Sequence, residues 1–391
     1  MKSQYLIYVF IIAWCNLSLP AQDFTHLETA LGRSSDSELV KVRIADVPED
    51  QGIWVRSRQG FAVILPESGQ EIAVIPAANA LVYVLRSVIH AGGTPLPGGV
   101  VLLVPREDLF TVNGIRYRGE LIAARANGRL TIVNRLPVEE YLRGVLPHEV
   151  DPAWHEEALK AQAIVSRSYV LSRALDNKSQ AHDLDNSTAS QVYRGASGEK
   201  PSTDQAVAET SGLVMTHNGQ IAVGFFHSCC GGSTEDSGDV WSRTLPYLRA
   251  RPSPYCEGTK HRDWGVVLGK AELAQVLGMS GEINAIEVRG RTSGGRAVHV
   301  FAQSTSGESQ QVTGERFRVL VGVNRLKSRL FDLSIRGPYV QVLGHGWGHG
   351  VGMCQWSSAK MAELGFDAAG IVHYFFTDVR IEPRRVRWPA P

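Results

Sequence analysis

The sequence predicts an α+β fold, in which mixed sheets and a few helices follow a small β-rich N-terminal unit. Short β-branched runs, separated by Gly, Pro and polar residues, dominate positions 38–133. Apolar residues then recur at helical spacing from about position 136, and strand and helix patterns mix beyond about position 190. Strands and helices do not alternate regularly, so the pattern does not indicate the parallel sheet of a βαβ protein.

The N-terminal unit is expected to be a small antiparallel β structure. Its regularly spaced runs are ELVKVRIADV, GIWVRSR, GFAVIL, EIAVIPA, ALVYVLRSV, GGVVLLVP, GIRYRGELIAAR and GRLTIVN. Beyond the central helices we expect strands in QVYRG, AVAET and GLVMTHNGQIAVGFFHS, and a hairpin in EINAIEVRGRTSGGRAVHVFAQS. Helical patterns follow in AELAQVLG and GERFRVLVG.

Two central helices are expected on either side of a joint bounded by prolines. Pro137 suits the first position of a helix that Pro147 ends. Asp151 and Pro152 suit the N-cap and the first position of a second helix. Its expected buried stripe is Trp154, Ala158, Ala161 and Val165, and its expected polar stripe is Gln162, Ser166, Tyr169 and Arg173.

Length and charge limit the class of protein. The chain has 391 residues, with 40 Lys+Arg against 39 Asp+Glu, for a net charge of +1. That length predicts two or three structural units, each able to bury a core. The near-zero balance lacks the basic excess typical of nucleic-acid binding, so no nucleic-acid partner is expected. A neutral polymer such as a glycan is compatible with it.

Residues 1–21 have the pattern of a secretory signal peptide. Lys2 supplies the positive start, Leu6–Cys15 form a short apolar core, and Ala21 offers a cleavage point before Gln22. The apolar core is too short to span a bilayer comfortably, which disfavours the alternative of an uncleaved anchor. We therefore expect an exported protein, located in the periplasm or the cell wall.

The first half of segment 136–171 contains a dense group of carboxylates. Its members are Glu139, Glu140, Glu149, Asp151, Glu156 and Glu157. Capping and helix-dipole effects of about 1 kcal/mol each explain all of them except Glu149. Glu149 lies between the two prolines of the joint and has no evident capping role. It is therefore the candidate for chemistry, with an ordinary surface role as the alternative.

A Cys/His segment follows the second group of strands. His227, Cys229, Cys230 and Cys256 could bind zinc, which takes tetrahedral N and S ligands. A disulfide from Cys256 to one of the adjacent pair is the alternative, because neighbouring cysteines bridge each other only with strain. The spacing does not match a CxxC…CxxC framework, so the sequence leaves both possibilities open.

The segment GHGWGHGVGMCQW combines closely spaced glycines with polar and aromatic side chains. His345, Trp347, His349 and Gln355 offer hydrogen-bonding groups and a flat apolar face, and the glycines allow close approach of the backbone. The segment predicts the lip of a binding or active site, with a tight packing corner as the alternative. Cys354 is a conceivable nucleophile, but no base partner is specified for it.

Several familiar catalytic motifs are excluded. His148-Glu149 and His155-Glu156 lack the second histidine that a zinc protease places at helical spacing. The sequence SCCGG is not the GxSxG elbow of a serine hydrolase. The glycine-rich segment has no GK[ST] and therefore does not match a phosphate-binding loop.

Several motifs, taken in order, resemble the SpoIID/LytB family, the relatives of stage II sporulation protein D and of amidase-enhancer proteins. They are LPVEEYLRGVLPHEV…EEALKAQAIVSRSYVL, QVYRG, AVAETSGLVMTHNGQIAVGFFHSCCGGSTED, VWSRTLPYLRA and GHGWGHGVGMCQW. The resemblance covers roughly residues 110 to 380 and departs at MCQWSSAKMA, where many relatives have QWGA. It implies an α+β catalytic domain at 126–385, preceded by a β-rich region at 22–125.

The resemblance also implies a lytic transglycosylase that cleaves peptidoglycan strands stripped of their stem peptides. The family's catalytic acid/base falls on Glu149, and the sugar's own 6-hydroxyl attacks the anomeric carbon to leave 1,6-anhydromuramyl ends. One carboxylate then suffices and the chemistry requires no cofactor. The implied substrate-binding residues are Gln162, Arg167, Tyr169, Ser228, His349 and Gln355. An ion pair for Arg167 and a core position for Tyr169 are the structural alternatives.

Two further implications concern metal and partners. Some relatives carry zinc near the Cys/His segment, which implies a structural zinc on His227, Cys230 and Cys256, with a disulfide as the alternative. The enhancer branch of the family implies a non-catalytic protein that binds wall glycan and stimulates an N-acetylmuramoyl-L-alanine amidase. The presence of Glu149 favours the enzyme over the enhancer, and a metal-dependent hydrolase is a distant third.

Overall fold

The computed structural model describes residues 39–76, 78–177, 182–186, 190–241 and 243–384. The predicted signal peptide at 1–21 lies outside the described residues. The chain forms two compact units: within the described ranges, the N-terminal unit contains 39–153 and 166–211, and the C-terminal unit contains 154–165 and 212–384. Within those ranges, no helix combines the length and apolarity needed to cross a membrane.

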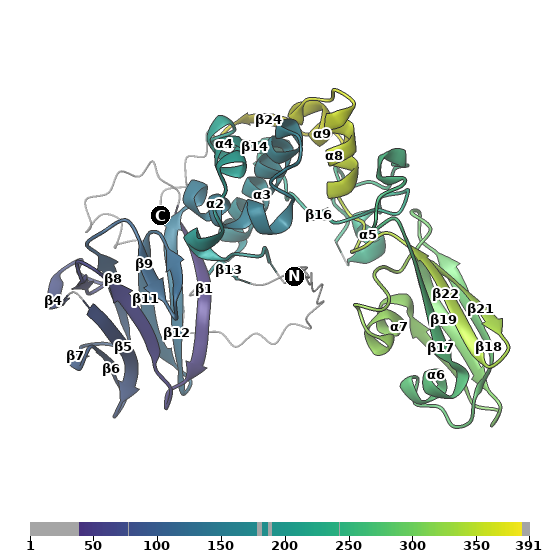
Figure 1. The fold of residues 1–391 in the computed structure, drawn as a ribbon, viewed down its shortest axis with the longest axis horizontal. Helices are drawn as coiled ribbons and strands as arrows, with labels where there is room; N and C mark the ends of the chain where they lie inside the picture. The colour runs from purple at the N-terminus through teal and green to yellow at the C-terminus, as the bar shows by residue number, and fades with distance from the viewer. Residues whose placement is uncertain (1–38, 77, 178–181, 187–189, 242, 385–391) are drawn as a thin grey trace. The chain divides into compact units, whose positions relative to one another are not determined.

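The N-terminal unit is built mainly from antiparallel strands, as predicted (Figure 1). The strands are β1 (Leu39–Pro48), β2 (Ile53–Ser57), β3 (Phe61–Ile64), β4 (Glu71–Ile75), β5 (Ala78–Leu85), β6 (Val88–Ala91), β7 (Thr94–Leu96), β8 (Val100–Pro105), β9 (Phe110–Val112), β10 (Ile115–Tyr117), β11 (Glu120–Ala126), β12 (Arg129–Pro137) and β13 (Leu184–Asp185). They form two sheets, of order β13-β1-β12-β11-β8-β3-β4 and β10-β9-β2-β5-β6-β7. The predicted boundary between residues 125 and 126 falls within β11.

Strands of the two sheets differ in how much of their length is buried. In β2, buried Ile53, Val55 and Ser57 alternate with exposed residues, as expected of a strand with one face in the core. In contrast, β12 is buried along nearly its whole length, because helix α2 (Val138–Glu149) follows it directly in the same unit. The last strand of the hairpin thus leads without a loop into the helix that carries Glu149.

Helix α3 (Glu156–Asp176) contributes to both units, with residues up to Val165 in the C-terminal unit and the remainder in the N-terminal unit. Ala158, Ala161 and Val165 are buried, as predicted. Three residues of the predicted polar stripe, Gln162, Ser166 and Tyr169, are buried as well, at no more than 6% exposed each.

Two strand predictions in the N-terminal unit are wrong. AVAET lies in helix α4 (Pro201–Glu209) and its end, and QVYRG forms no strand before the short 3-10 helix at Gly195–Gly198. Pro201 stands at the first position of α4, where its missing N–H costs nothing. The alanines that follow favour helix, so AVAET continues a helix that starts upstream of it.

The C-terminal unit contains short sheets, helices and a pair of larger sheets. Its elements are β14 (Leu213–His217), β15 (Gln220–Ile221), β16 (Phe226–His227), α5 (Ser237–Val240), β17 (Asp263–Gly269), α6 (Lys270–Val276), β18 (Ile283–Arg291), β19 (Ala297–Ser304), β20 (Ser309–Thr313), α7 (Gly314–Val321), β21 (Phe331–Arg336), β22 (Tyr339–His345), β23 (Met353–Cys354), α8 (Gln355–Glu363), α9 (Ala368–Phe375) and β24 (Arg380–Pro383). The predicted hairpin β18–β19 and the helices α6 and α7 are confirmed.

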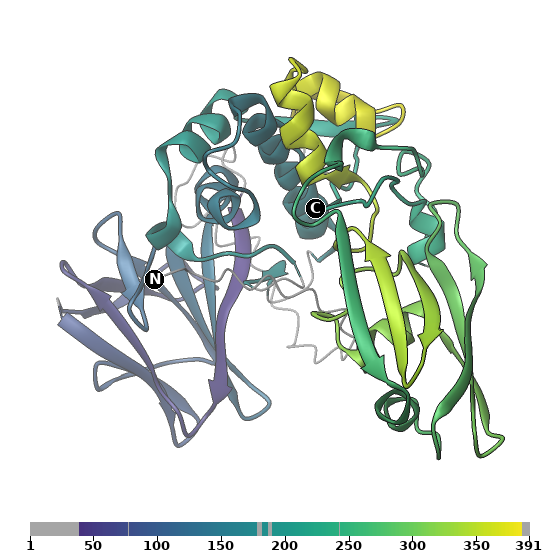
Figure 2. The ribbon, with the colours of Figure 1, turned by 45° about the vertical axis from the view of Figure 1, so that its right-hand side comes forward.

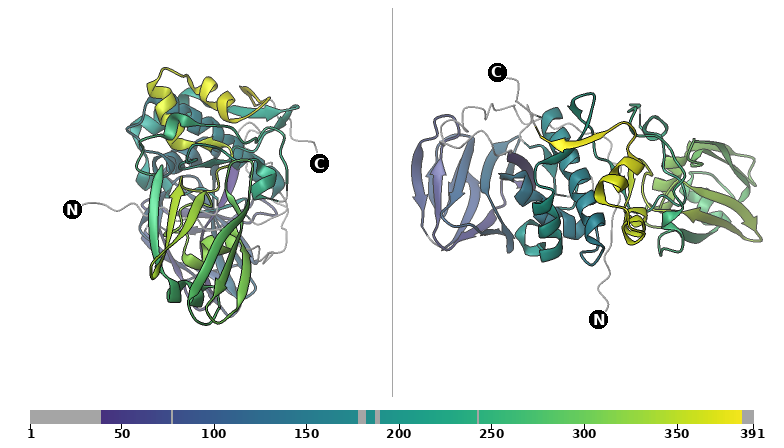
Figure 3. Two further views of the ribbon diagram at one scale, coloured as in Figure 1. Left: turned by 90° about the vertical axis from the view of Figure 1, so that its right-hand side faces the viewer. Right: turned by 90° about the horizontal axis from the view of Figure 1, so that it is seen from above.

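This unit has two hydrophobic cores. One lies between the sheets β17-β22-β21 and β18-β19-β20 and the helices α6 and α7, and includes Phe317, Phe331 and Val340 (Figure 2). The other packs the first half of α3 with α8 and α9, which lie at the opposite end of the unit from the strand tips (Figure 3, left). All four cysteines beyond residue 38 belong to this second core. The predicted α+β class is therefore confirmed.

Candidate functional site

Glu149 is the last residue of α2, and a backbone amide from another segment holds its carboxylate. Val192 N donates to Glu149 Oε1 at 2.8 Å. The preceding residue, Gln191, is buried and accepts a hydrogen bond from Tyr141 Oη at 3.1 Å, which ties the segment to the same helix. Glu149 itself is half-buried. The N-terminal unit thus fixes the direction of this carboxylate through a segment that is more than 40 residues away in sequence.

The predicted joint around Glu149 differs from the structure in detail. Pro147 does not end the helix but lies inside its last turn. Because Pro147 lies so close to the C-terminus of the helix, its ring removes only one backbone hydrogen bond, and the helix continues for two more residues. Asp151 does not cap α3: its Oδ1 accepts from Ala153 N at 2.9 Å in a turn, and His155 Nδ1 accepts from Glu157 N at 3.2 Å at the start of the helix.

Glu139 is more than the helix-dipole charge that its position suggested. Its two carboxylate oxygens accept from Arg167 Nε at 2.9 Å and Arg167 Nη2 at 2.7 Å, in a bidentate ion pair. Arg167 is 1% exposed, and it also donates to the Val207 carbonyl. These contacts agree with the structural alternative for Arg167, an ion pair with an acidic neighbour. Arg167 lies on α3, and through these contacts it connects α3 to α2 and α4. Tyr169 is 6% exposed, which corresponds to its core alternative.

Four of the predicted substrate-binding residues lie in the C-terminal unit. Gln355 Nε2 donates to Gln162 Oε1 at 3.4 Å, so α8 brings these two side chains together on α3. The carbonyl of Ser228 accepts from Trp356 N at 3.1 Å, beside the same helix start. His349 Nδ1 accepts from Val351 N at 3.0 Å, and its ring lies 5.5 Å from that of His227. Glu149, Arg167 and Tyr169 belong to the N-terminal unit.

The glycines of the segment GHGWGHGVGMCQW allow its backbone to pack closely against neighbouring segments. Gly346 has φ +72°, and a Cβ there would lie 2.6 Å from the Cys229 carbonyl oxygen. A Cβ on Gly350, at φ +86°, would lie 2.3 Å from the guanidinium of Arg296. Residues other than glycine would be strained by the backbone angle and would clash at both positions. The packing-corner alternative therefore accounts for these glycines.

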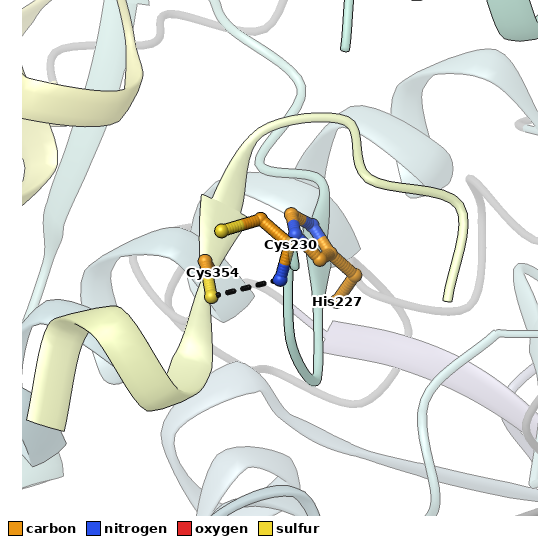
Figure 4. A group of neighbouring side chains, drawn as sticks. All are labelled: His227, Cys230 and Cys354. Atoms are coloured by element: carbon orange, nitrogen blue, oxygen red, sulfur yellow. Dashed lines mark hydrogen bonds between the residues drawn. The ribbon is translucent and has the colours of Figure 1, made fainter. Parts of the chain in front are cut away.

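His227 and the four cysteines Cys229, Cys230, Cys256 and Cys354 are buried and lie close together. Figure 4 shows three of them, His227, Cys230 and Cys354. Potential ligand atoms lie within 4.8 Å of one another in two groups, His227–Cys230–Cys354 and Cys229–Cys256–Cys354. Cys354 belongs to both groups and was not expected among the ligands. No spacing pattern in the sequence indicates Cys354 as a ligand, because it lies far from His227 along the chain and only the parallel pairing of β16 with β23 places it opposite His227.

All four cysteines are free thiols in the structure. Cys230 Sγ and Cys256 Sγ are 3.5 Å apart, well beyond the roughly 2.05 Å of a disulfide bond. Hydrogen bonds from Cys229, Cys230 and Cys354 lower the pKa of the Cys256 thiol. Burial raises the pKa of Cys354. The expected proximity of Cys256 to the adjacent pair is present, and the disulfide is not.

The donor set fits a zinc ion. His227 Nδ1 lies 3.1 Å from the Val351 carbonyl, so Nδ1 carries the proton and Nε2 keeps its lone pair. Within the described residues, Nε2 is buried with no hydrogen-bond partner. Burial lowers the pKa of His227, and so does nearby His349, which keeps the imidazole neutral as a metal ligand must be. Cysteine thiolates and a neutral histidine are the usual ligands of structural zinc.

A buried ion pair, which the sequence analysis did not identify, supports the cysteine segment. Arg296 and Glu235 are at most 1% exposed, with Arg296 Nη1 3.5 Å from Glu235 Oε2. Arg296 Nη2 donates to the Cys230 carbonyl at 3.0 Å, and Glu235 Oε1 accepts from Gly294 N. The turn of the β18–β19 hairpin is thereby joined to the cysteine segment. Two charges far apart in sequence give no pattern by which to predict such a pair.

Comparison with known proteins agrees with these motifs. A family model described as SpoIID, stage II sporulation protein, matches residues 126–217. An uncharacterized protein of Brachyspira hyodysenteriae is 32% identical over 280 residues, which cover 70% of this chain and 74% of that protein. Stage II sporulation protein D of Bacillus subtilis is 29% identical over 265 residues, covering 64% of this chain and 75% of that protein.

The amidase enhancer of Bacillus subtilis is 27% identical over 283 residues. The match covers 60% of this chain but 39% of that longer protein. The family model includes α2, α3 and α4 and thus the whole setting of Glu149. On the extent and identity of these matches, the chain belongs to the SpoIID/LytB family of stage II sporulation protein D and amidase-enhancer relatives.

Proposed function

We propose that this protein is an exported lytic transglycosylase that cleaves denuded peptidoglycan strands with Glu149 as its single acid/base. The proposal rests mainly on one observation. Glu149 is the last residue of α2, and the Val192 amide holds its carboxylate through a hydrogen bond. Of the neighbouring carboxylates, Glu139 is committed to Arg167, Asp151 to a turn, and Glu157 to the Ala368 amide at 2.7 Å. These contacts support Glu149, rather than Glu139, Asp151 or Glu157, as the proposed acid/base.

In the proposed reaction, Glu149 donates one proton and later accepts one. In the protonated state, the Glu149 carboxyl donates its proton to the glycosidic oxygen as the bond from that oxygen to the anomeric carbon breaks. The resulting carboxylate accepts the proton of the sugar's 6-hydroxyl as that oxygen attacks the anomeric carbon. The products are a free 4-hydroxyl on one strand and a 1,6-anhydro ring on the other, with Glu149 protonated again.

Use of the 6-hydroxyl removes the need for a second carboxylate. A hydrolase that retains or inverts configuration needs two, because water or an enzyme nucleophile must be activated separately. Here the nucleophile belongs to the substrate and is held close to the reacting carbon, so orientation replaces the second acid. Within the C-terminal unit, Gln162, Gln355 and His349 remain proposed contacts for sugar hydroxyl and acetamido groups of the strand.

The Cys/His group is proposed as a structural zinc site. Its ligands would come from His227, Cys229, Cys230, Cys256 and Cys354, which tie β16, β23 and the segment before β17 together. The ion would supply folding free energy without taking part in proton transfer. Metal analysis and thiol counting on the purified protein test this: about one zinc per chain and protected thiols are expected. Four reactive thiols with no metal would refute the site.

Mass analysis of products from purified glycan strands tests the proposed reaction. Anhydromuramyl ends are expected. Reducing ends would identify a hydrolase instead, and intact strands would favour the second candidate, a wall-binding enhancer of an amidase, which the similarity to the amidase enhancer supports. The N-terminus of the mature native protein tests export, because a chain that begins near Gln22 is expected outside the cytoplasm.

A further inference from the structure

Four aromatic rings of the C-terminal unit form a continuous row outside the cysteine group. The ring of Trp154 lies 5.3 Å from that of Trp356, Trp356 lies 5.8 Å from His261, and His261 lies 4.7 Å from Trp347. Each contact is edge-to-face, with interplanar angles between 64° and 79°. None of the four residues is fully buried. We call this set the ring row.

Two lysines flank the ring row. Lys260 Nζ lies 5.6 Å from the ring centre of Trp356, and Lys327 Nζ lies 5.1 Å from that of Trp347. Within the described residues, neither lysine has an ion pair with a carboxylate, and each lies over an aromatic ring. Burial lowers the pKa of His261 to about 4, followed by the charges of Lys260 and Lys327, so this imidazole is neutral at physiological pH. The positive charge beside the ring row is therefore carried by the ammonium groups of Lys260 and Lys327.

Backbone hydrogen bonds fix the ring row in place. Trp347 N donates to the Cys229 carbonyl at 2.7 Å, and Cys229 N donates back to the Trp347 carbonyl at 3.1 Å. Trp356 N donates to the Ser228 carbonyl. The backbones of Trp347 and Trp356 are therefore held against the segment that contains Ser228 and the proposed zinc ligand Cys229. Partly exposed aromatic rings held rigidly next to unpaired cations are typical of a binding surface rather than of a core.

We propose that the ring row is a glycan subsite that recognises a sugar carrying a free carboxylate, with Lys260 and Lys327 as the residues that select for the charge. The inference rests on the proposed function, since it names the feature of the strand that the protein reads. Sugar rings pack their apolar C–H faces on aromatic rings, and an ammonium group binds a carboxylate through a charge-assisted hydrogen bond.

The position of the charge distinguishes denuded strands from those that still carry stem peptides. In an intact strand the lactyl group of each muramic acid is joined to its peptide through a neutral amide, and any carboxylate lies farther out on the peptide. An amidase hydrolyses that amide and leaves a carboxylate on the sugar itself. Two lysines beside a row of rings match a strand with a negative charge on every second sugar ring.

The test compares binding of two probes to the full-length chain. One probe is a denuded glycan strand, and the other is the same strand with its lactyl carboxylates converted to methylamides. Glu149→Gln is used as background so that strands stay intact. Lys260→Met and Lys327→Met should each weaken binding of the first probe by about 5-fold, the upper range for an exposed ion pair. The double variant should bind both probes equally.

Controls separate charge selection from general effects. Lys360→Met removes one charge from an exposed pair with Glu363 in the same unit and should leave the ratio of the two affinities unchanged. Trp356→Leu should weaken binding of both probes alike, and thermal melting checks that each variant is folded. Retention of the full preference for the carboxylate by the double lysine variant would overturn the inference.

The outcome for the subsite is independent of the outcome for the reaction. A wild-type protein that prefers the carboxylated strand but leaves no anhydromuramyl ends would refute the transglycosylase and retain the subsite. Anhydromuramyl ends together with equal affinity of the wild-type protein for both probes would support the enzyme and refute the subsite.

Discussion

At the scale of single residues, the contrast between Glu149 and its neighbours governs the expected effects of substitution. Glu149→Gln keeps the side-chain shape and an acceptor for the Val192 amide, but removes the proton that the reaction needs. Strand cleavage should fall by at least about 10²-fold, the usual range for loss of an acid/base group. Product release from purified strands is the measurement.

The matched control is Glu156→Gln, which changes an exposed carboxylate on the first turn of α3 with a side chain that is 63% exposed. It should cleave normally. Near-normal cleavage by a folded Glu149→Gln protein would refute Glu149 as the acid/base.

Glu139 is expected to matter for stability, and not for chemistry. Glu139→Gln would remove the bidentate partner of a guanidinium that is 1% exposed. The free energy of unfolding should fall by about 2 kcal/mol, the range for hydrogen bonds to charged groups, which exceeds the helix-dipole effect expected from sequence alone. Urea unfolding measures it, and a loss no greater than that of Glu156→Gln would contradict the structural role of the pair.

Asp183 is expected to make stability fall as the pH rises. Burial raises the pKa of Asp183 to about 6, and Lys41 opposes this shift only in part. Between about pH 4 and pH 6 the folded state therefore holds a proton that the unfolded state has lost, so this group destabilises the fold increasingly up to its folded pKa. Asp183→Asn should remove a loss of about 3 kcal/mol across that interval. Equal pH profiles for the two proteins would contradict the assignment.

At the scale of elements, the hairpin β18–β19 and the cysteine segment are joined by Arg296 and Glu235. Arg296→Met would leave the Glu235 carboxylate buried beside a methionine and the Cys230 carbonyl without its guanidinium donor. We expect a loss of about 3 kcal/mol in unfolding free energy and faster labelling of Cys230 by a thiol reagent.

A suitable control for Arg296 is Arg325→Met, which breaks an exposed pair with Glu272 and should change both quantities little. Unchanged labelling of Cys230 in Arg296→Met would show that the pair does not hold the segment.

Local patterns predicted elements well and packing between elements poorly. The strands before residue 137 and the hairpin β18–β19 were predicted from β-branched runs and the turn residues between them, whereas the catalytic role of Glu149 stays a prediction. Arg167, Arg296 and Cys354 could not be assigned in this way, because their partners lie at least 28 residues away along the chain. AVAET was mistaken for a strand because a five-residue apolar run carries too little periodicity to distinguish strand from helix.

At the scale of the whole molecule, the two units are interleaved along the chain. A fragment of residues 126–385 would keep β12 but lose β1 and β11, the strands that pair with it on both sides. The buried residues of β12 would then be exposed. We expect this fragment to aggregate or to lack cooperative unfolding, whereas a fragment of residues 39–384 unfolds cooperatively. Thermal melting followed by circular dichroism decides, and a cooperative transition in the shorter fragment would contradict the expectation.

The shared helix α3 also has a consequence for the newborn chain. Synthesis proceeds from the N-terminus at about 5–20 residues per second, so residue 211, which closes the N-terminal unit, emerges roughly 10 to 40 s after the start. The first half of α3 must wait longer still, because α8 and α9 are made last. During that interval the part of its surface that α8 and α9 cover in the folded protein has no partner. A chaperone that holds the growing polypeptide is therefore expected to cover this surface until α8 and α9 arrive.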